Sequence, residues 1–152
     1  MRPLKLMIES VRSGTIASLA MMPLGVLFKT LDLRVGYYGP KLGALLFDNP
    51  TQLVLFAQHL VLGWVSALPL LVLLIRLHAA PRPVAVGAAY GAAYYVLMNS
   101  LALPLFFGDA TPWRLGFDYI YPSLIIHLVF GVSVALTSRR YVASEIRRAV
   151  DQ

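Results

Sequence analysis

Long runs of apolar residues constrain this chain more than any other feature of its sequence. Residues 52–75, 84–108 and 119–138 contain no aspartate, glutamate, lysine or arginine, and residues 12–30 carry charge only near their ends. A helix needs about 20 mainly apolar residues to cross the hydrocarbon core of a bilayer. The sequence therefore predicts four membrane-spanning helices at approximately these positions.

The overall composition also indicates that lipid surrounds the chain. Hydrophobic residues make up 59% of the 152 residues, charged residues make up 13%, and the mean hydropathy is +0.72. Soluble domains usually carry about 25% charged residues, and a chain this short could not bury so much apolar surface in water. We therefore predict an all-α protein in which residues 1–152 form a single integral membrane domain surrounded by a lipid bilayer.

The segments around the predicted spans contain several turn signals. Residues 29–51 form the longest connection, and within it residues 40–47 are too short to cross a membrane, so we expect a short interfacial helix there. Tyr37 and Tyr38 fit the aromatic belt found at membrane interfaces. Pro23, inside the first run, predicts a kink or a local break.

The basic residues predict an orientation rather than a nucleic-acid partner. The net charge is +6, but the basic residues lie at the ends of the apolar runs and form no single patch or stripe. The N-terminal segment, residues 76–83 and the tail after residue 138 hold nine lysines and arginines, against four in the other two connections. Because cytoplasmic loops are enriched in these residues, we expect both termini of this multi-pass protein in the cytoplasm.

Two of the runs contain similar segments. The ten residues that start at His59 and the ten that start at His127 are identical at six positions, which include both histidines and a glycine four residues later. The copies lie in the second and fourth spans, with one span between them, so their helices run in the same direction. The fold expected is a four-helix bundle built as two repeated helical hairpins.

The simplest interpretation of the histidines and glycines is helix packing. Small residues four apart let membrane helices approach closely, and a polar side chain can then form a hydrogen bond across the interface. The residues expected to do this are Gly63, Gly131, Gly87, Gly91 and Asn99. On this interpretation the protein has a structural or interaction role, for example as an accessory subunit with a membrane-protein partner or as a homo-oligomer, and it needs no cofactor.

Other interpretations stay open because ionisable residues are costly inside a membrane. His59 and His127 could ligate haem b from facing helices. Together with Met21 or Met22 they could instead form a soft-metal site, since imidazole and thioether ligands suit copper(I). A third interpretation is a small transporter or lipid path lined by the two histidines and Asn99.

The sequence favours a protein without enzymatic activity and yields no candidate catalytic residue. It contains no phosphate-binding loop, nucleophile elbow or HExxH motif. No aspartate or glutamate falls inside a predicted span, which weighs against an ion-coupled pump. The absence of cysteine excludes thiolate metal ligands.

The pattern of small and polar residues along the spans resembles a known group of proteins. The residues that carry the resemblance are Gly14-Thr15, Met21-Met22-Pro23, His59-x-x-x-Gly63, the helix with Gly87, Gly91, Met98 and Pro104, and His127-x-x-x-Gly131. In these features the chain resembles small bacterial inner-membrane proteins of unknown function, the YagU-like and related families. The resemblance implies four spans in the bacterial inner membrane and implies no reaction.

Overall fold

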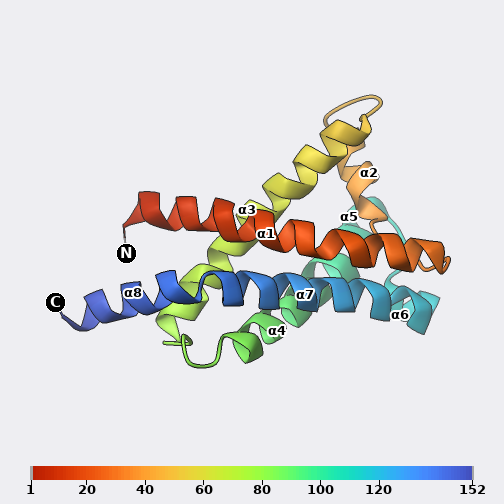
Figure 1. The fold of residues 1–152 in the computed structure, drawn as a ribbon. Helices are drawn as coiled ribbons and strands as arrows, with labels where there is room; N and C mark the ends of the chain where they lie inside the picture. The colour runs from red at the N-terminus through yellow and green to blue at the C-terminus, as the bar shows by residue number, and fades with distance from the viewer. Residues whose placement is uncertain (1, 152) are drawn as a thin grey trace.

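The computed structural model describes residues 2–151, which form an α-helical bundle without any strand among them (Figure 1). Its elements in chain order are α1 (Pro3–Thr30), α2 (Tyr38–Ala44), α3 (Gln52–Arg76), α4 (Pro83–Tyr94), η1 (Tyr95–Ala102), α5 (Leu103–Phe107), α6 (Pro112–Leu115), η2 (Phe117–Tyr119), α7 (Tyr121–Thr137) and α8 (Arg139–Val150). Element η1 is a π-helix and η2 is a 3₁₀-helix. The prediction of an all-α bundle is confirmed.

Four stretches of helix are long and apolar enough to cross a membrane. The first is α1, of 28 residues, and the second is α3, of 25 residues. The third runs from α4 through η1 to α5 and has 25 residues, and the fourth comprises η2 and α7 and has 21 residues. At about 1.5 Å per residue, even the shortest exceeds the roughly 30 Å of a hydrocarbon core. Large apolar side chains face outward, such as Leu53 and Leu105, which are 75% and 71% exposed. These helices support a multi-pass membrane protein.

The first helix is longer than the sequence suggested. It begins at Pro3 rather than near residue 12, and it continues through Pro23 without a break. Proline is well suited to the first turn of a helix because its missing N–H has no partner there anyway. Glu9 is buried, and Arg12 neutralises it with hydrogen bonds of 2.5 and 3.0 Å to its carboxylate. Residues 3–12 therefore belong to the first long helix.

The third long helix contains a π-helical segment that the sequence did not predict. Pro104 has no N–H to donate to the carbonyl of Ser100, and its ring would collide with that carbonyl in a regular α-helix. The wider turns of the π-helix η1 end at Ala102, two residues before Pro104. Such segments change the direction in which the following side chains point, and they occur often at functional sites.

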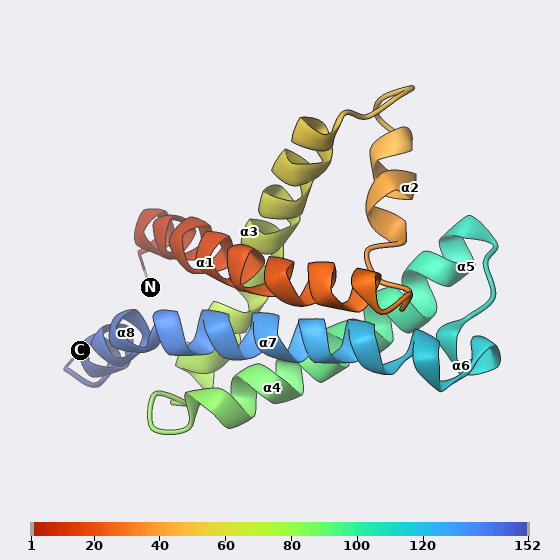
Figure 2. The same cartoon turned by 45° about the vertical axis from the view of Figure 1, so that its right-hand side comes forward.

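The long helices form two packed pairs that meet along α1 and α7. In Figure 1, α1 and α7 run side by side, α3 crosses them steeply, and α4 lies along the other side of α7. Helix α1 packs on α3 and on α7, and helix α4 packs on α7. Both termini lie at the same end of the bundle, as the turned view in Figure 2 also shows. The short helix α2 lies at the opposite end, beside α5.

Glycines allow the backbones of each pair to touch. In the first pair, a Cβ atom added to Gly14 of α1 would lie 2.8 Å from the carbonyl oxygen of Gly63 in α3. In the second pair, a Cβ atom added to Gly131 of α7 would overlap the carbonyl oxygen of Gly87 in α4, and it would lie 3.0 Å from the amide nitrogen of Gly91. Neither crossing leaves room for a side chain.

The two halves of the bundle are packed differently. Near the termini, side chains of α1, α3 and α7 form a continuous hydrophobic core in which Ala17, Leu70 and Val134 are completely buried. Val142 extends this core onto α8, the helix that follows α7. The other half, toward α2 and α5, contains a cavity instead.

A substitution at the α4–α7 crossing tests its role in stability. We expect Gly131→Ala to lower the thermal unfolding temperature in mild detergent, because the obstructing atoms belong to the backbone of α4 and cannot rotate away. Overpacking usually costs about 1–3 kcal/mol. In the control variant Gly25→Ala the new methyl group meets no atom within 4 Å, so its unfolding temperature should stay the same or rise slightly. Equal unfolding temperatures for both variants would contradict the close approach.

Candidate ligand cavity

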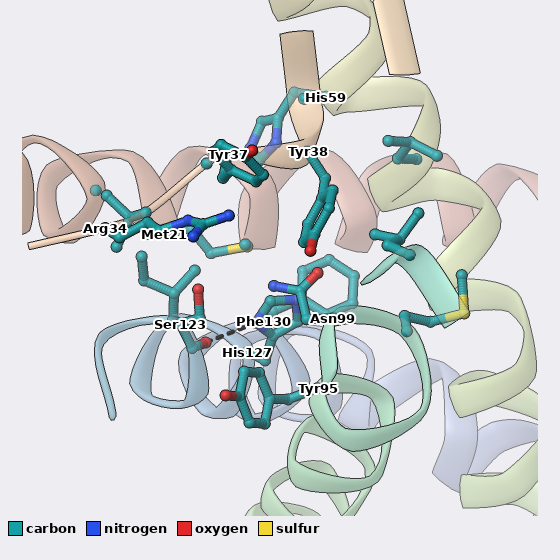
Figure 3. Close-up of a pocket in the computed structure, with 18 of the residues that line it drawn as sticks. Met21, Arg34, Tyr37, Tyr38, His59, Tyr95, Asn99, Ser123, His127 and Phe130 are labelled. Carbon is teal, nitrogen blue, oxygen red and sulfur yellow. Dashed lines mark hydrogen bonds between the residues drawn. The ribbon is translucent and has the colours of Figure 1, made fainter. Parts of the chain in front are cut away.

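A cavity of about 670 Å³ occupies the half of the bundle away from the termini (Figure 3). Its walls come from the second half of α1, the first half of α3, η1 and the first half of α7. Residues 34–40 and Leu42 of α2 line the remaining side, together with Ala110, Pro112, Leu115 and Tyr119. The cavity is partly open, and lining side chains such as Val26 and Leu62 are 62% and 41% exposed. Its volume lies within the range of about 300–1,000 Å³ that is typical of ligand pockets.

The polar and sulfur-bearing residues that the sequence singled out all line this cavity. They are Met21, Met22, His59, Asn99 and His127, and they come from four different helices. These side chains share a position around one cavity, although they are far apart in the sequence. Of the glycines expected at helix contacts, Gly63 reaches the cavity wall, while the remaining three lie at the α4–α7 crossing.

His127 is held in a defined orientation by its surroundings. Its Nδ1 lies 2.6 Å from the carbonyl oxygen of Ser123, and its ring stacks on Tyr94 with centroids 5.7 Å apart and tilts against Tyr95 at 5.8 Å. A carbonyl oxygen only accepts hydrogen bonds, so Nδ1 carries the proton. The Nε2 atom of the neutral ring is therefore left as an acceptor.

His59 is held differently, in spite of the similar sequence around it. Its Nε2 atom donates to the carbonyl oxygen of Ser18 in α1, at 3.2 Å, which leaves Nδ1 as the acceptor. Figure 3 shows His59 and His127 reaching the cavity from different sides. The acceptor nitrogen is therefore Nδ1 in His59 and Nε2 in His127. The similar sequences around the two histidines gave no sign of this difference.

The carboxylate and imidazole groups do not assemble into a larger metal site. Within residues 2–151, no three histidine, cysteine, aspartate or glutamate side chains are grouped so that they could hold a metal ion. A metal in the cavity would have to use the imidazoles together with methionine sulfur. Figure 3 shows that Met21 points into the cavity, where its thioether could take part.

The connection after α1 folds over one side of the cavity and is fixed to two helices. The ammonium group of Lys41 donates hydrogen bonds of 2.6 and 2.8 Å to the carboxylate of Asp109. Tyr38 stacks on Phe107, with centroids 5.9 Å apart, and Gln58 donates to the carbonyl oxygen of Gly39 at 3.0 Å. The contact with Asp109 raises the pKa of Lys41 above its ordinary value, so the ion pair persists at neutral pH and is lost only as the pH rises through that raised pKa.

Arg34 also lines the cavity, and no motif in the sequence had singled it out. Its guanidinium carbon lies 3.5 Å from the centroid of the Tyr37 ring and 5.5 Å from that of Tyr119. A tyrosine pair three and four residues after a lone arginine was the available signal, because guanidinium groups stack on aromatic rings. The contact with Tyr119 joins segments far apart in the chain, and no local pattern reveals it.

Comparisons with protein-family models, with curated proteins and with solved structures found no match. The function must therefore be argued from the cavity itself.

Proposed function

We propose that this chain is a multi-pass protein of the bacterial inner membrane that binds a small amphiphilic molecule in its cavity, as a binding or transport component. The observation that carries the proposal is the cavity of about 670 Å³ lined by polar and sulfur-bearing side chains from four helices. Its size suits a ligand with a single apolar chain better than a two-chain phospholipid. Most of the lining is apolar, and a few polar groups converge on it, as is usual for ligand sites.

A purely structural role explains less of the molecule. An accessory subunit that packs against a membrane-protein partner, or against a second copy of the chain, would account for the glycine crossings. It would give no reason for an open space where the side chains of four helices meet, because an unfilled cavity forfeits packing energy.

The two hairpins further support an origin by duplication. In each, a helix with the His-x-x-x-Gly pattern packs on the helix before it at a pair of small residues four apart. The contacts are Gly63 with Gly14 and Ser18, and Gly131 with Gly87 and Gly91. We infer that the bundle is built from two repeated hairpins that enclose the cavity at their junction.

The proposed location and orientation rest on charge and on resemblance. Both termini lie at one end of the bundle (Figure 1), and the sequence places most of the basic residues in the segments at that end. The distribution of basic residues supports cytoplasmic termini. The resemblance to YagU-like proteins supports the bacterial inner membrane.

A variant that fills the cavity tests the proposal. Gly25 lines the cavity and has open space at its Cβ position, so Gly25→Trp should fill part of the cavity without disturbing a helix contact. We expect native mass spectrometry of protein extracted in mild detergent to detect a bound lipid or fatty acid. Its occupancy should fall at least fivefold in Gly25→Trp.

The matched control places the same side chain on the outside of the same helix. Ala20 is exposed and does not line the cavity, so Ala20→Trp should retain the bound molecule at the wild-type level. The absence of any bound molecule in the wild type, or equal occupancy in both variants, would contradict the proposal.

A haem b or soft-metal redox function is the second candidate, and the orientation of His127 favours it. Metal-ligating histidines usually donate one ring N–H to a carbonyl or carboxylate, as Nδ1 does here, and the free Nε2 is then available as a ligand. His59 would supply Nδ1 from the other side of the cavity, and Met21 could supply a thioether to a soft metal.

Visible absorption distinguishes haem from the other candidates. If the two histidines bind haem b, protein from haem-supplemented cells should show a Soret band that is lost in both His59→Ala and His127→Ala. A featureless Soret region in the wild type would remove haem from consideration.

A further inference from the structure

The charged side chains that line the cavity have a single sign. Lys29 and Arg34 line it, and no aspartate or glutamate does. Asp109, on the neighbouring connection, is already paired with Lys41. The lining therefore carries an excess of positive charge at the end farthest from the termini.

Arg34 is held in place without using its hydrogen-bond donors. The guanidinium lies over Tyr37 and near Tyr119, and these cation–π contacts hold it beside the two rings. Within residues 2–151 it donates no hydrogen bond and forms no salt bridge, not even with Asp32 two positions earlier. An arginine has five N–H donors in a rigid fork that matches carboxylate and phosphate groups. Figure 3 shows this fork directed into the cavity.

The rest of the cavity suits an apolar chain. Beyond the level of the histidines, toward the packed core, its lining includes Leu62 of α3 and Phe130 of α7. Phe130 belongs to that core, so this end of the cavity adjoins tightly packed side chains. The cavity thus has a basic end beside the connection after α1 and an apolar end in the middle of the bundle.

We infer that the cavity selects an anionic amphiphile, with a phosphate or carboxylate head group bound by Arg34 and a single apolar chain directed toward Phe130. This inference rests on the proposed function and narrows its ligand class. Two parallel hydrogen bonds from a guanidinium give both orientation and strength to such a head group. Lys29 adds a second positive charge to the same lining.

Three probes separate the head group from the chain. They are tetradecyl phosphate, tetradecanol and inorganic phosphate, and binding is measured from the ligand dependence of the unfolding temperature in a fixed excess of neutral detergent. For the full-length wild type we expect tetradecyl phosphate to bind at least tenfold more tightly than either tetradecanol or inorganic phosphate.

Substitutions of Arg34 test whether this residue causes the preference for tetradecyl phosphate over tetradecanol. Arg34→Gln should remove the difference between tetradecyl phosphate and tetradecanol while leaving tetradecanol binding unchanged. Arg34→Lys, which keeps the charge but lacks the planar fork, should retain a smaller preference and serves if the glutamine variant does not fold. The control Arg114→Gln changes an exposed arginine that does not line the cavity, and its preference should equal that of the wild type.

The outcomes that overturn the inference are distinct from those that overturn the proposed function. Equal affinity of the wild type for tetradecyl phosphate and tetradecanol, or an unchanged preference in Arg34→Gln, would refute head-group selection and leave a cavity that binds amphiphiles. Binding of inorganic phosphate as tight as that of tetradecyl phosphate would refute the role of the apolar chain. Binding of none of the three probes would contradict the proposed function as well.

Discussion

The close approach of helix backbones at glycines is the constraint on which the rest of this structure depends. At each crossing a helix with a His-x-x-x-Gly pattern lies so near its partner that a methyl group would collide with a carbonyl oxygen. In a bilayer, helices gain little from burying apolar surface against one another, so such contacts supply much of the association energy. One crossing holds α1 against α3 and the other holds α4 against α7, which forms the two hairpins. The contact between α1 and α7 then joins the hairpins.

The position of the crossings decides where the bundle is solid and where it is open. On the terminal side of Gly63 and Gly131, apolar side chains fill the space between α1, α3 and α7. On the other side the helices enclose a cavity, and the connection after α1 covers part of it through the Lys41–Asp109 pair and the Tyr38–Phe107 stack. The histidines lie on this open side, four residues before each glycine.

The sequence could reveal the features that depend on local pattern and not those that depend on distant contacts. Charge-free runs indicated all four long helices, because length and hydropathy suffice for that purpose. The continuation of α1 to Pro3 was missed, and the contacts of this segment include a distant one, the hydrogen bond of 2.6 Å from Arg12 to the carbonyl oxygen of Thr137. The π-helix before Pro104 and the stacking of Arg34 on Tyr119 also escaped prediction, because each depends on hydrogen-bond register or on packing that spacing does not encode.

Four helices surround an accessible, partly open cavity beside a closely packed core. The chain has no cysteine, so single cysteines can report on each region without interference. Asn99 lines the cavity and Ala67 is completely buried in the core. In detergent-solubilised protein, Asn99→Cys should react rapidly with a small polar thiol reagent, and Ala67→Cys should react only after unfolding. Equal protection of the two cysteines would contradict the account.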